Sequence, residues 1–264
     1  MKVAVVQMDC APGNVAGNCQ KIVDFTERAR EAGCAVVIFP EMADTGYDMG
    51  LVRDAASPWE RGDMQSPVAI VGEAARASGL HVICGLSEKV DSNVFNTCAV
   101  FAPSGDLVGK YRKSHLAAYP LLREDDYVQP GDALASVEIG DTRWGLTICY
   151  DLRFPEVSRR YALDGADVVN LCSAWPFPRV GHWRTLARAR AIENQVYFIA
   201  ANRTGTDGSV TFCGSSCIVD PYGVLIATAA EDREEMIFGE IRRETVATVR
   251  EYMPVLGQRR EELY

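Results

Sequence analysis

The feature that most constrains the fold is an apolar stretch that ends abruptly in a cysteine, a polar turn and a proline, between Arg143 and Glu156. The apolar residues before Cys149 predict a buried strand. Pro155 is placed to open a helix, because its missing N–H is not needed in the first helical turn. Strand, turn and helix in this order present a side chain at the carboxyl end of a strand, where open α/β sheets bind ligands. The helix N-terminus is expected to lower the pKa of the Cys149 thiol.

Alternating strand and helix patterns over the first two thirds of the chain predict a mixed α/β fold. Asn14 is a candidate N-cap for a helix reaching residue 32, and Ser66 for a second helix ending before Gly79. The expected strands are 3–8, 35–39, 81–84, 97–101, 107–113, 135–139, 143–149, 166–172 and 196–201. The other expected helices are 154–164 and 182–194, and residues 114–134 are expected to be irregular.

The sequence of the last third of the chain predicts antiparallel strands instead. Its strands are expected at 213–219, 224–228 and 236–241, followed by a helix at 243–252 and a polar tail. No internal repeat or linker interrupts the pattern, so residues 1–264 are predicted to form one domain.

Composition narrows the possible partners and compartment. The formal net charge of −9 argues against nucleic acid as a partner, since nucleic-acid binding usually leaves a basic patch. No apolar run approaches the length of a membrane span, and no signal segment is evident at the start. The cysteines are odd in number and lie scattered in apolar stretches, at positions 10, 19, 34, 84, 98, 149, 172, 213 and 217. We therefore expect free thiols in a cytoplasmic protein that does not bind membranes.

An acid and a base accompany Cys149 at the predicted strand ends. Glu41 directly follows the strand at 35–39, and Lys113 ends the strand at 107–113. If these strands are neighbours, all three side chains lie at one edge of a sheet. A carboxylate can take a thiol proton, and an ammonium can hold the negative charge that develops on an attacked carbonyl oxygen.

A cysteine–histidine pair is the rival arrangement. The histidines are His81, His115 and His182, of which His81 heads a core strand and His182 is expected to begin a helix. Nothing in the sequence favours a pair of Cys149 with any of them. Isolated histidines also make a poor ligand set for a metal-dependent amidohydrolase.

Short motifs around Glu41, Lys113 and Cys149, in this order along the chain, indicate a family. Phe39-Pro40-Glu41 with Thr45-Gly46-Tyr47, Gly109 to Leu116, and Cys149 to Glu156 together resemble the nitrilase superfamily of carbon–nitrogen hydrolases, over nearly the whole chain. The resemblance implies a four-layer αββα sandwich and a triad of Glu41, Lys113 and Cys149.

The resemblance also implies a second glutamate before Pro130-Gly131-Asp132, which Glu124 matches, although Asp125 and Asp126 beside it leave open which carboxylate faces the site. The implied chemistry is acyl transfer through a Cys149 thioester, with Lys113 and the backbone N–H of Tyr150 holding the oxyanion. It requires no metal or organic cofactor.

A second stretch bears on the substrate. Trp175-Pro176-Phe177-Pro178-Arg179, followed by His182-Trp183, resembles the branch that acts on ω-amides of α-keto acids. Trp175 is expected to form a pocket wall and Arg179 to bind a carboxylate, with Tyr47 as a further substrate-binding residue. Arg153 is expected to pair with Asp151 or Glu156 within the turn. The alternatives within the same class of enzyme are an N-carbamoyl amidase, an aliphatic amidase and a true nitrilase. The alternative from a different functional class is a non-catalytic protein that serves as a binding module or scaffold.

The polar C-terminal segment 243–264 has few anchors of its own. In the resembling family such tails cross to a partner subunit, so the resemblance implies a homodimer or a larger homo-oligomer. The loop at 114–130 is a candidate lid.

Overall fold

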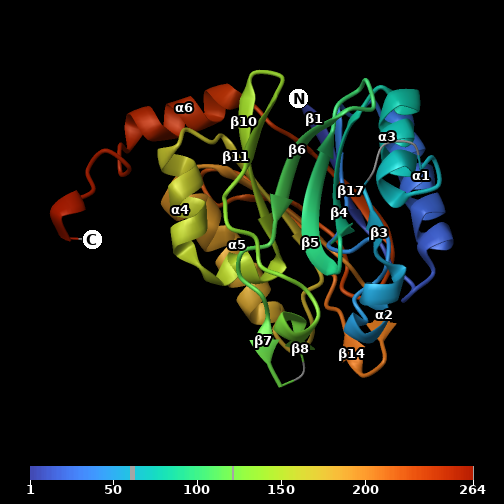
Figure 1. The fold of residues 1–264 in the computed structure, drawn as a ribbon. Coiled ribbons are helices and arrows are strands. Elements are labelled where there is room, and N and C mark those ends of the chain that lie inside the picture. Colours follow the sequence, from blue (N-terminus) through green and yellow to red (C-terminus); the bar gives the residue numbers. More distant parts are fainter. Residues whose placement is uncertain (60–62, 121, 264) are drawn as a thin grey trace.

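The computed structural model describes residues 1–59, 63–120 and 122–263, in which two sheets pack face to face (Figure 1). In the first sheet, β1, β2 and β4 run parallel, and β17, β5 and β6 extend it with antiparallel pairs. The order across it is β17 (Glu235–Glu240), β1 (Lys2–Gln7), β2 (Val36–Ile38), β4 (His81–Val90), β5 (Asn93–Phe101) and β6 (Leu107–Arg112). A short β3 (Ser57–Pro58) pairs with β4 outside this path.

The second sheet has the same plan. Its centre is the parallel set β10, β11 and β12, flanked by antiparallel strands. The order is β16 (Leu225–Thr228), β15 (Cys217–Val219), β12 (Tyr197–Asn202), β11 (Val168–Ser173), β10 (Thr142–Ile148) and β9 (Ser136–Ile139). Two small hairpins complete the strands, β7 (Ala118–Tyr119) with β8 (Leu122–Arg123) and β13 (Thr206–Asp207) with β14 (Val210–Thr211).

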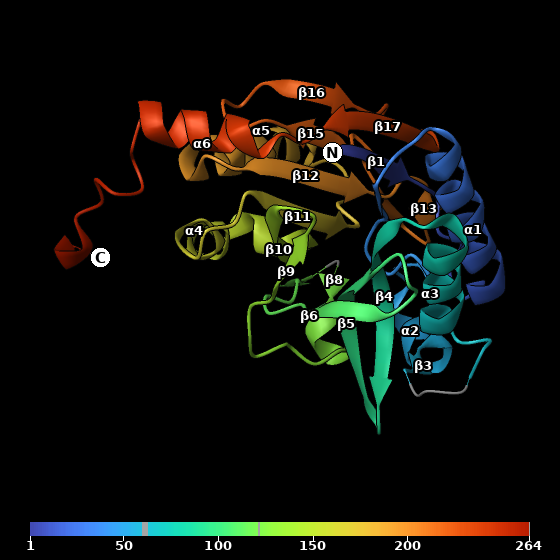
Figure 2. The ribbon, with the colours of Figure 1, turned by 90° about the horizontal axis from the view of Figure 1, so that it is seen from above.

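Helices cover the outer faces of both sheets (Figure 2). The first sheet carries α1 (Val15–Glu31) and α3 (Pro67–Ser78), and the second carries α4 (Pro155–Leu163) and α5 (Val180–Asn194). Val5 and Val100 from the first sheet share one buried cluster with Leu146 and Leu171 from the second. Layers of helix, sheet, sheet and helix form the αββα sandwich that the resemblance implied.

Capping side chains and a glycine explain where α1 and α3 begin and where α3 ends. The Asn14 side chain accepts a hydrogen bond from Gly17 N at 3.2 Å, and Ser66 accepts one from Ala69 N at 3.4 Å. Both side chains satisfy a free backbone donor at the start of a helix. Gly79 closes α3 in the left-handed conformation, with φ of 69°. These predictions from the sequence are confirmed.

Other expectations were wrong in detail. The strand expected at 143–149 ends at Ile148, and α5 begins at Val180, before His182. The segment expected to be irregular, 114–134, holds β7, β8 and a 3₁₀ helix at Glu124–Asp126, elements too short to leave a periodic pattern. The seven-residue α2 (Met49–Ala55) was missed for the same reason.

The C-terminal segment begins with α6 (Arg243–Tyr252), as expected. Beyond α6 the chain extends away from the sandwich, past α4 (Figure 1). Leu121 of the candidate lid and Tyr264 lie outside the described residues. None of the described helices is long and apolar enough to cross a membrane. The assignment of residues 1–264 to one domain stays a prediction.

Candidate active site

The three residues expected at strand ends come together between the two sheets. Glu41 follows β2, Lys113 follows β6 in the same sheet, and Cys149 follows β10 in the facing sheet. Glu41 and Lys113 are fully buried, and Cys149 is buried at the start of a 3₁₀ turn, Cys149–Arg153. Residues from both sheets are therefore needed to form the site.

Lys113 lies between two buried carboxylates. Its Nζ is 2.7 Å from Glu41 Oε1, and it is 2.7 Å and 3.0 Å from the two carboxylate oxygens of Glu124. Asp125 and Asp126 are exposed and instead bond to Arg123. Glu124 is therefore the carboxylate that faces the site, which the sequence had left open.

Asn96 on β5 ties this cluster together and was missed by the sequence analysis. Its Nδ2 donates to Glu41 Oε1 at 2.7 Å and to Glu124 Oε1 at 2.8 Å. Its backbone oxygen accepts from Lys113 N at 2.9 Å. Asn96 lies just before the strand predicted at 97–101. In the structure β5 begins at Asn93, which places this amide among buried residues, where it needs hydrogen-bond partners.

The backbone around Glu41 is held very close to β4. A Cβ on Gly85 would lie 2.5 Å from the Pro40 oxygen and 2.6 Å from the Glu41 Cα, so only glycine fits there. Ala43 N donates to the Gly85 oxygen at 2.8 Å, and Ala174 N donates to Glu41 Oε2 at 2.7 Å. The first contact holds the backbone next to Glu41, and the second fixes the direction of its carboxylate.

The turn after β10 is held by the carboxylate of Asp151. Ile148 N donates to Asp151 Oδ2 at 2.9 Å, and the Tyr111 hydroxyl donates to the same oxygen at 2.8 Å. Cys149 itself has a φ of 40°, in the left-handed region that residues with a Cβ rarely adopt. Such strain is typical of functional sites where the surroundings fix the backbone.

Burial and neighbouring charges set the protonation of the site. Burial holds the pKa of Glu41 above its usual value, although Lys113 opposes the shift. Burial alone would lower the pKa of Lys113, but Glu124 and Glu41 hold it well above its usual value. Lys113 is therefore an ammonium suited to holding negative charge, and Glu41 is a strong base for a carboxylate.

The expected lowering of the Cys149 pKa was wrong. Burial, and after it the charge of Glu41, hold the pKa of this thiol well above its ordinary value, against the opposite effect of Lys113. The turn Cys149–Arg153 separates the thiol from α4, which opens at Pro155 as the sequence predicted. The thiol therefore keeps its proton at rest and needs a base to react.

Cys149 opens onto a small cavity of about 10 Å³, room for a single water molecule. The side chains around it come from the β7–β8 hairpin, the Cys149 turn and the loop after β11. They are Ala117, Tyr119, Leu122, Tyr150, Arg153, Trp175, Pro176 and Arg179. Trp175 and Arg179 thus lie where the sequence placed them, beside Cys149. A substrate needs the side chains of this wall to move apart.

Arg153 also lines the cavity, and its expected pairing with Asp151 or Glu156 was wrong. Its guanidinium lies 4.5 Å from the Trp175 ring centroid, and its Nη1 lies 3.5 Å from His182 Nδ1. Asp151 is occupied by Ile148 N and Tyr111, which leaves Arg153 to turn toward the aromatic wall.

Tyr47 lies on the other side of Lys113, outside the wall of this cavity. Lys113 Nζ is 5.8 Å from the centroid of its ring, and Tyr47 N donates to Asp207 Oδ2 at 3.0 Å. The Tyr47 hydroxyl is buried with no hydrogen-bond partner among the described residues. An unsatisfied hydroxyl beside the carboxylate cluster is available to a ligand.

The described residues offer no group of three or more His, Cys, Asp or Glu side chains placed to hold a metal ion. His115 and His182 lie near the site, but each contacts residues other than Cys149: His115 bonds to Asp151, and His182 approaches Arg153. The chemistry of the residues present is thus a thiol, a carboxylate base and an ammonium.

Comparisons with known proteins show the family of the chain. Residues 2–251 match the family model described as carbon-nitrogen hydrolase. The chain is 33% identical over 263 residues to "2-oxoglutaramate amidase" of Bacillus subtilis (strain 168), covering 99% of this chain and 98% of that protein. It is 30% identical to "Omega-amidase NIT2" of Homo sapiens, covering 100% of this chain and 96% of the human protein.

Solved structures have the same fold. Nit3 of Saccharomyces cerevisiae, a member of branch 10 of the nitrilase superfamily, superposes with a TM-score of 0.89 at 29% identity, over 98% of this chain and 96% of that chain. A carbon-nitrogen hydrolase from Helicobacter pylori G27 gives a TM-score of 0.88 at 26% identity, over 100% of this chain and 96% of that chain.

Proposed function

The chain belongs to the carbon–nitrogen hydrolase family, and we propose that it hydrolyses the ω-amide of an α-keto acid, such as 2-oxoglutaramate, to the acid and ammonia. It is an amide-hydrolysing enzyme, and the proposal concerns the substrate and the role of each residue. Such a substrate has an amide at one end and a carboxylate at the other. The site must therefore hold an anion at a distance from the thiol.

One observation carries the proposal. Arg179 lines the cavity that contains Cys149, and its Nε is buried with no hydrogen-bond partner in the described part of the chain. Its Nη2 donates to the Tyr119 hydroxyl at 3.0 Å. A buried guanidinium N–H without an acceptor is costly, and a substrate carboxylate would satisfy it with a charge-assisted hydrogen bond.

Arg153 supplies a second guanidinium on the same wall. Its guanidinium lies over the Trp175 ring, 4.5 Å from the ring centroid, and lines the same cavity as Cys149. The negatively charged end of a keto acid has two cationic neighbours here, whereas a neutral aliphatic amide would leave their charges without an anionic partner and Arg179 Nε without an acceptor. This contrast favours the keto-acid amide over the other amides and nitriles.

In the first half of the reaction, Glu41 takes the proton from Cys149 as the sulfur attacks the amide carbon. The carbonyl oxygen becomes an oxyanion, which Lys113 and the backbone N–H of Tyr150 stabilise. Glu41 then returns its proton to the nitrogen as the C–N bond breaks. Ammonia leaves, and the acyl group remains on Cys149 as a thioester.

In the second half, Glu41 takes a proton from water as the water oxygen attacks the thioester carbon. The same donors hold the second oxyanion, the C–S bond breaks, and Glu41 returns the proton to the sulfur. Glu124 keeps Lys113 charged and in place, through the contacts of 2.7 Å and 3.0 Å. Each positioned base or donor of this kind contributes on the order of 10²–10³-fold in rate.

The test is ammonia release from 2-oxoglutaramate, a simple aliphatic amide, an N-carbamoyl amino acid and a nitrile. A kcat/KM for 2-oxoglutaramate far above the others is the expected result. Equal or greater turnover of any other compound would contradict the substrate assignment and leave the residue roles standing. A scaffold without activity would release no ammonia and would show no rapidly alkylated cysteine.

We further propose that the protein works in the cytoplasm. All nine cysteines lie in the described part of the chain and are free and buried, including a pair, Cys98 and Cys172, with sulfurs 3.7 Å apart. Free thiols this close persist most readily in a reducing compartment.

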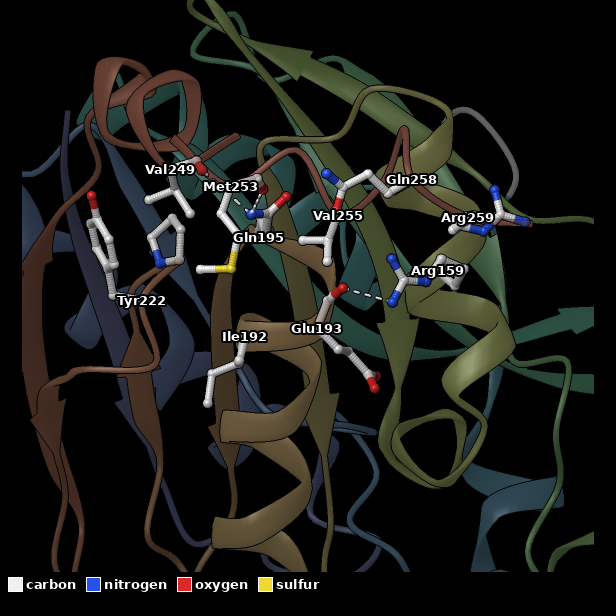
Figure 3. A pocket seen from close by; sticks show the side chains of 11 residues that line it. Arg159, Ile192, Glu193, Gln195, Tyr222, Val249, Met253, Val255, Gln258 and Arg259 are labelled. Atoms are coloured by element: carbon white, nitrogen blue, oxygen red, sulfur yellow. Dashed lines mark hydrogen bonds between the residues drawn. The ribbon is translucent and has the colours of Figure 1, made fainter. Parts of the chain in front are cut away.

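We also propose a homodimer built on the face that carries the C-terminal tail. A groove of about 540 Å³ lies between α5, the turn around Tyr222, α6 and the tail. Figure 3 shows Ile192, Met253 and Val255 around this hollow. Ile192 is 49% exposed and Met253 is 51% exposed, which is unusual for large apolar side chains gathered in one place.

A second copy of the chain is the occupant that fits this face. The tail projects beyond α4, away from its own sandwich, and carries exposed apolar side chains (Figure 1). A symmetric pair would let each tail pack on the other copy. Sedimentation should give twice the chain mass, and Ile192→Asp should give the monomer, whereas Leu51→Asp on the distant α2 should leave the dimer intact. A monomeric parent protein would contradict the proposal.

A further inference from the structure

Ser173 is the last residue of β11, and the register places it next to the nucleophile. Ile148 pairs with Cys172 across β10 and β11, so the following residues, Cys149 and Ser173, leave the two strands side by side. The Ser173 backbone oxygen accepts from Glu41 N at 3.5 Å, and Ala174 N donates to Glu41 Oε2 at 2.7 Å. The end of β11 therefore touches the segments of both the base and the thiol.

The Ser173 hydroxyl does not contribute a hydrogen bond to the stability of the fold. It is fully buried, and its Oγ makes no hydrogen bond of standard geometry to any described residue. A buried hydroxyl without a partner costs free energy, and it is retained at functional sites where another state of the molecule uses it. The sulfur of Cys149, at the end of the neighbouring strand, gains negative charge during the proposed reaction.

We propose that the Ser173 hydroxyl donates a hydrogen bond to the Cys149 sulfur when that sulfur is a thiolate. No proton is transferred in this contact, because Glu41 takes the thiol proton and Ser173 keeps its own. The bond stabilises the thiolate before attack and again when the thioester breaks. Ser173 is thus a hydrogen-bond donor to the nucleophile, beside the general base and the ammonium.

The protonation of the thiol supports this role. Burial and the charge of Glu41 raise the pKa of Cys149, and the nearby Ser173 hydroxyl and Ala174 N act in the opposite direction. A thiolate formed in a buried, partly anionic site needs such donors, since the cavity beside it has room for only a single water molecule.

The inference rests on the proposed function, in which Cys149 is the nucleophile, and the experiment separates the two. The rate of alkylation of Cys149 by iodoacetamide is measured against pH, with peptide mass spectrometry to identify the modified cysteine. This readout needs no substrate. If Cys149→Ala retained full amidase activity, the proposed function would fail regardless of the result for Ser173.

Ser173→Ala is expected to slow alkylation of Cys149 about tenfold at each pH at which the protein stays folded, because less of the thiol is ionised there. The kcat for the amide should fall by a similar factor with little change in KM. Thermal stability should stay equal or rise, because the change removes an unsatisfied buried hydroxyl. Ser173→Gly removes the same hydroxyl by a different change and should give the same decrease.

Ser57→Ala is the matched control. Ser57 on β3 also has a buried hydroxyl that lacks a partner within the described ranges, but it lies away from Cys149. Its loss should leave the alkylation profile and kcat unchanged. Parent-like alkylation rates in a folded Ser173→Ala or Ser173→Gly protein would overturn the inference.

Discussion

His115 Nδ1 lies 2.8 Å from Asp151 Oδ1, and this contact joins the segment that carries Lys113 to the turn that carries Cys149. The same carboxylate accepts from the Tyr111 hydroxyl at 2.8 Å. Residues of the two facing sheets thus meet at one buried carboxylate. The distance between the ammonium and the nucleophile depends on it, although Asp151 itself does not reach the substrate.

Asp151→Asn should therefore lower both stability and turnover. The amide presents N–H groups where donors from Ile148 and Tyr111 already point, so buried hydrogen bonds are lost at a cost of about 2 kcal/mol. Urea unfolding and kcat would measure the two effects. Asp164→Asn, which removes an exposed partner 2.9 Å from Arg160, is the control and should change neither by much. A fully active and stable Asp151→Asn protein would contradict this role.

Loss of the base or the nucleophile should abolish turnover without unfolding the protein. Glu41→Gln keeps the shape of the side chain but cannot accept the thiol proton, so kcat should fall on the order of 10³-fold. Cys149→Ala should release no ammonia above background. Circular dichroism and ammonia assays together check this, with Glu27→Gln on the exposed side of α1 as the control. Residual activity close to that of the parent in either variant would refute the assignment.

Glu124 and Asp125 provide a matched pair of neighbouring carboxylates. Glu124→Gln breaks a buried ion pair with Lys113, which should cost about 3 kcal/mol of stability and reduce kcat on the order of 10²-fold. Asp125→Asn alters an exposed pair with Arg123 and should change stability by less than about 0.5 kcal/mol. Comparable effects of the two substitutions would mean that Glu124 has no special place in the site.

Arg179→Met tests the substrate proposal directly. The change keeps the apolar stem but removes the guanidinium, so kcat/KM for 2-oxoglutaramate should fall on the order of 10²-fold. Turnover of a neutral aliphatic amide should change little, because that compound has no carboxylate. Arg184→Met on the exposed part of α5 is the control. An equal loss for charged and neutral amides would argue against carboxylate recognition by Arg179.

The buried carboxylate of Asp44 should give the protein a measurable dependence of stability on pH. Burial raises its pKa from 3.8 to about 6, although Ser87 N and Oγ donate to it. The folded state therefore holds this proton more tightly than the unfolded state. The contribution of Asp44 to stability is greatest below pH 3.8 and declines as pH rises to about 6.

Asp44→Asn stays neutral and removes this decline. As pH rises from about 4 to about 6, the free energy of unfolding should shift in favour of the variant, by up to about 3 kcal/mol. Urea unfolding of both proteins across this range measures the shift. A difference between variant and parent that does not change with pH would show that Asp44 does not titrate there.

Sequence alone brought Glu41, Lys113 and Cys149 into one hypothesis because each lies at the end of a predicted strand, and the family resemblance then implied that they form a triad. Glu41 follows the strand predicted at 35–39, and Lys113 and Cys149 end the strands predicted at 107–113 and 143–149. The carboxyl ends of strands are where sheets present ligand-binding side chains. The motifs around them supplied the family and hence the sandwich. Local signals also gave the helix starts at Asn14 and Ser66, since capping depends on residues within one turn.

Only the tertiary structure decided which side chains meet. Asn96 reaches Glu41 and Glu124 because β4, β5 and β6 pair in one register, and Asp151 holds His115 because the two sheets face each other. Arg153 lines the cavity because other donors already occupy Asp151, a competition that spacing along the chain does not reveal. Short-range patterns determine where strands end, whereas contacts between residues far apart in the chain depend on packing and hydrogen-bond competition, which exist only once the chain has folded.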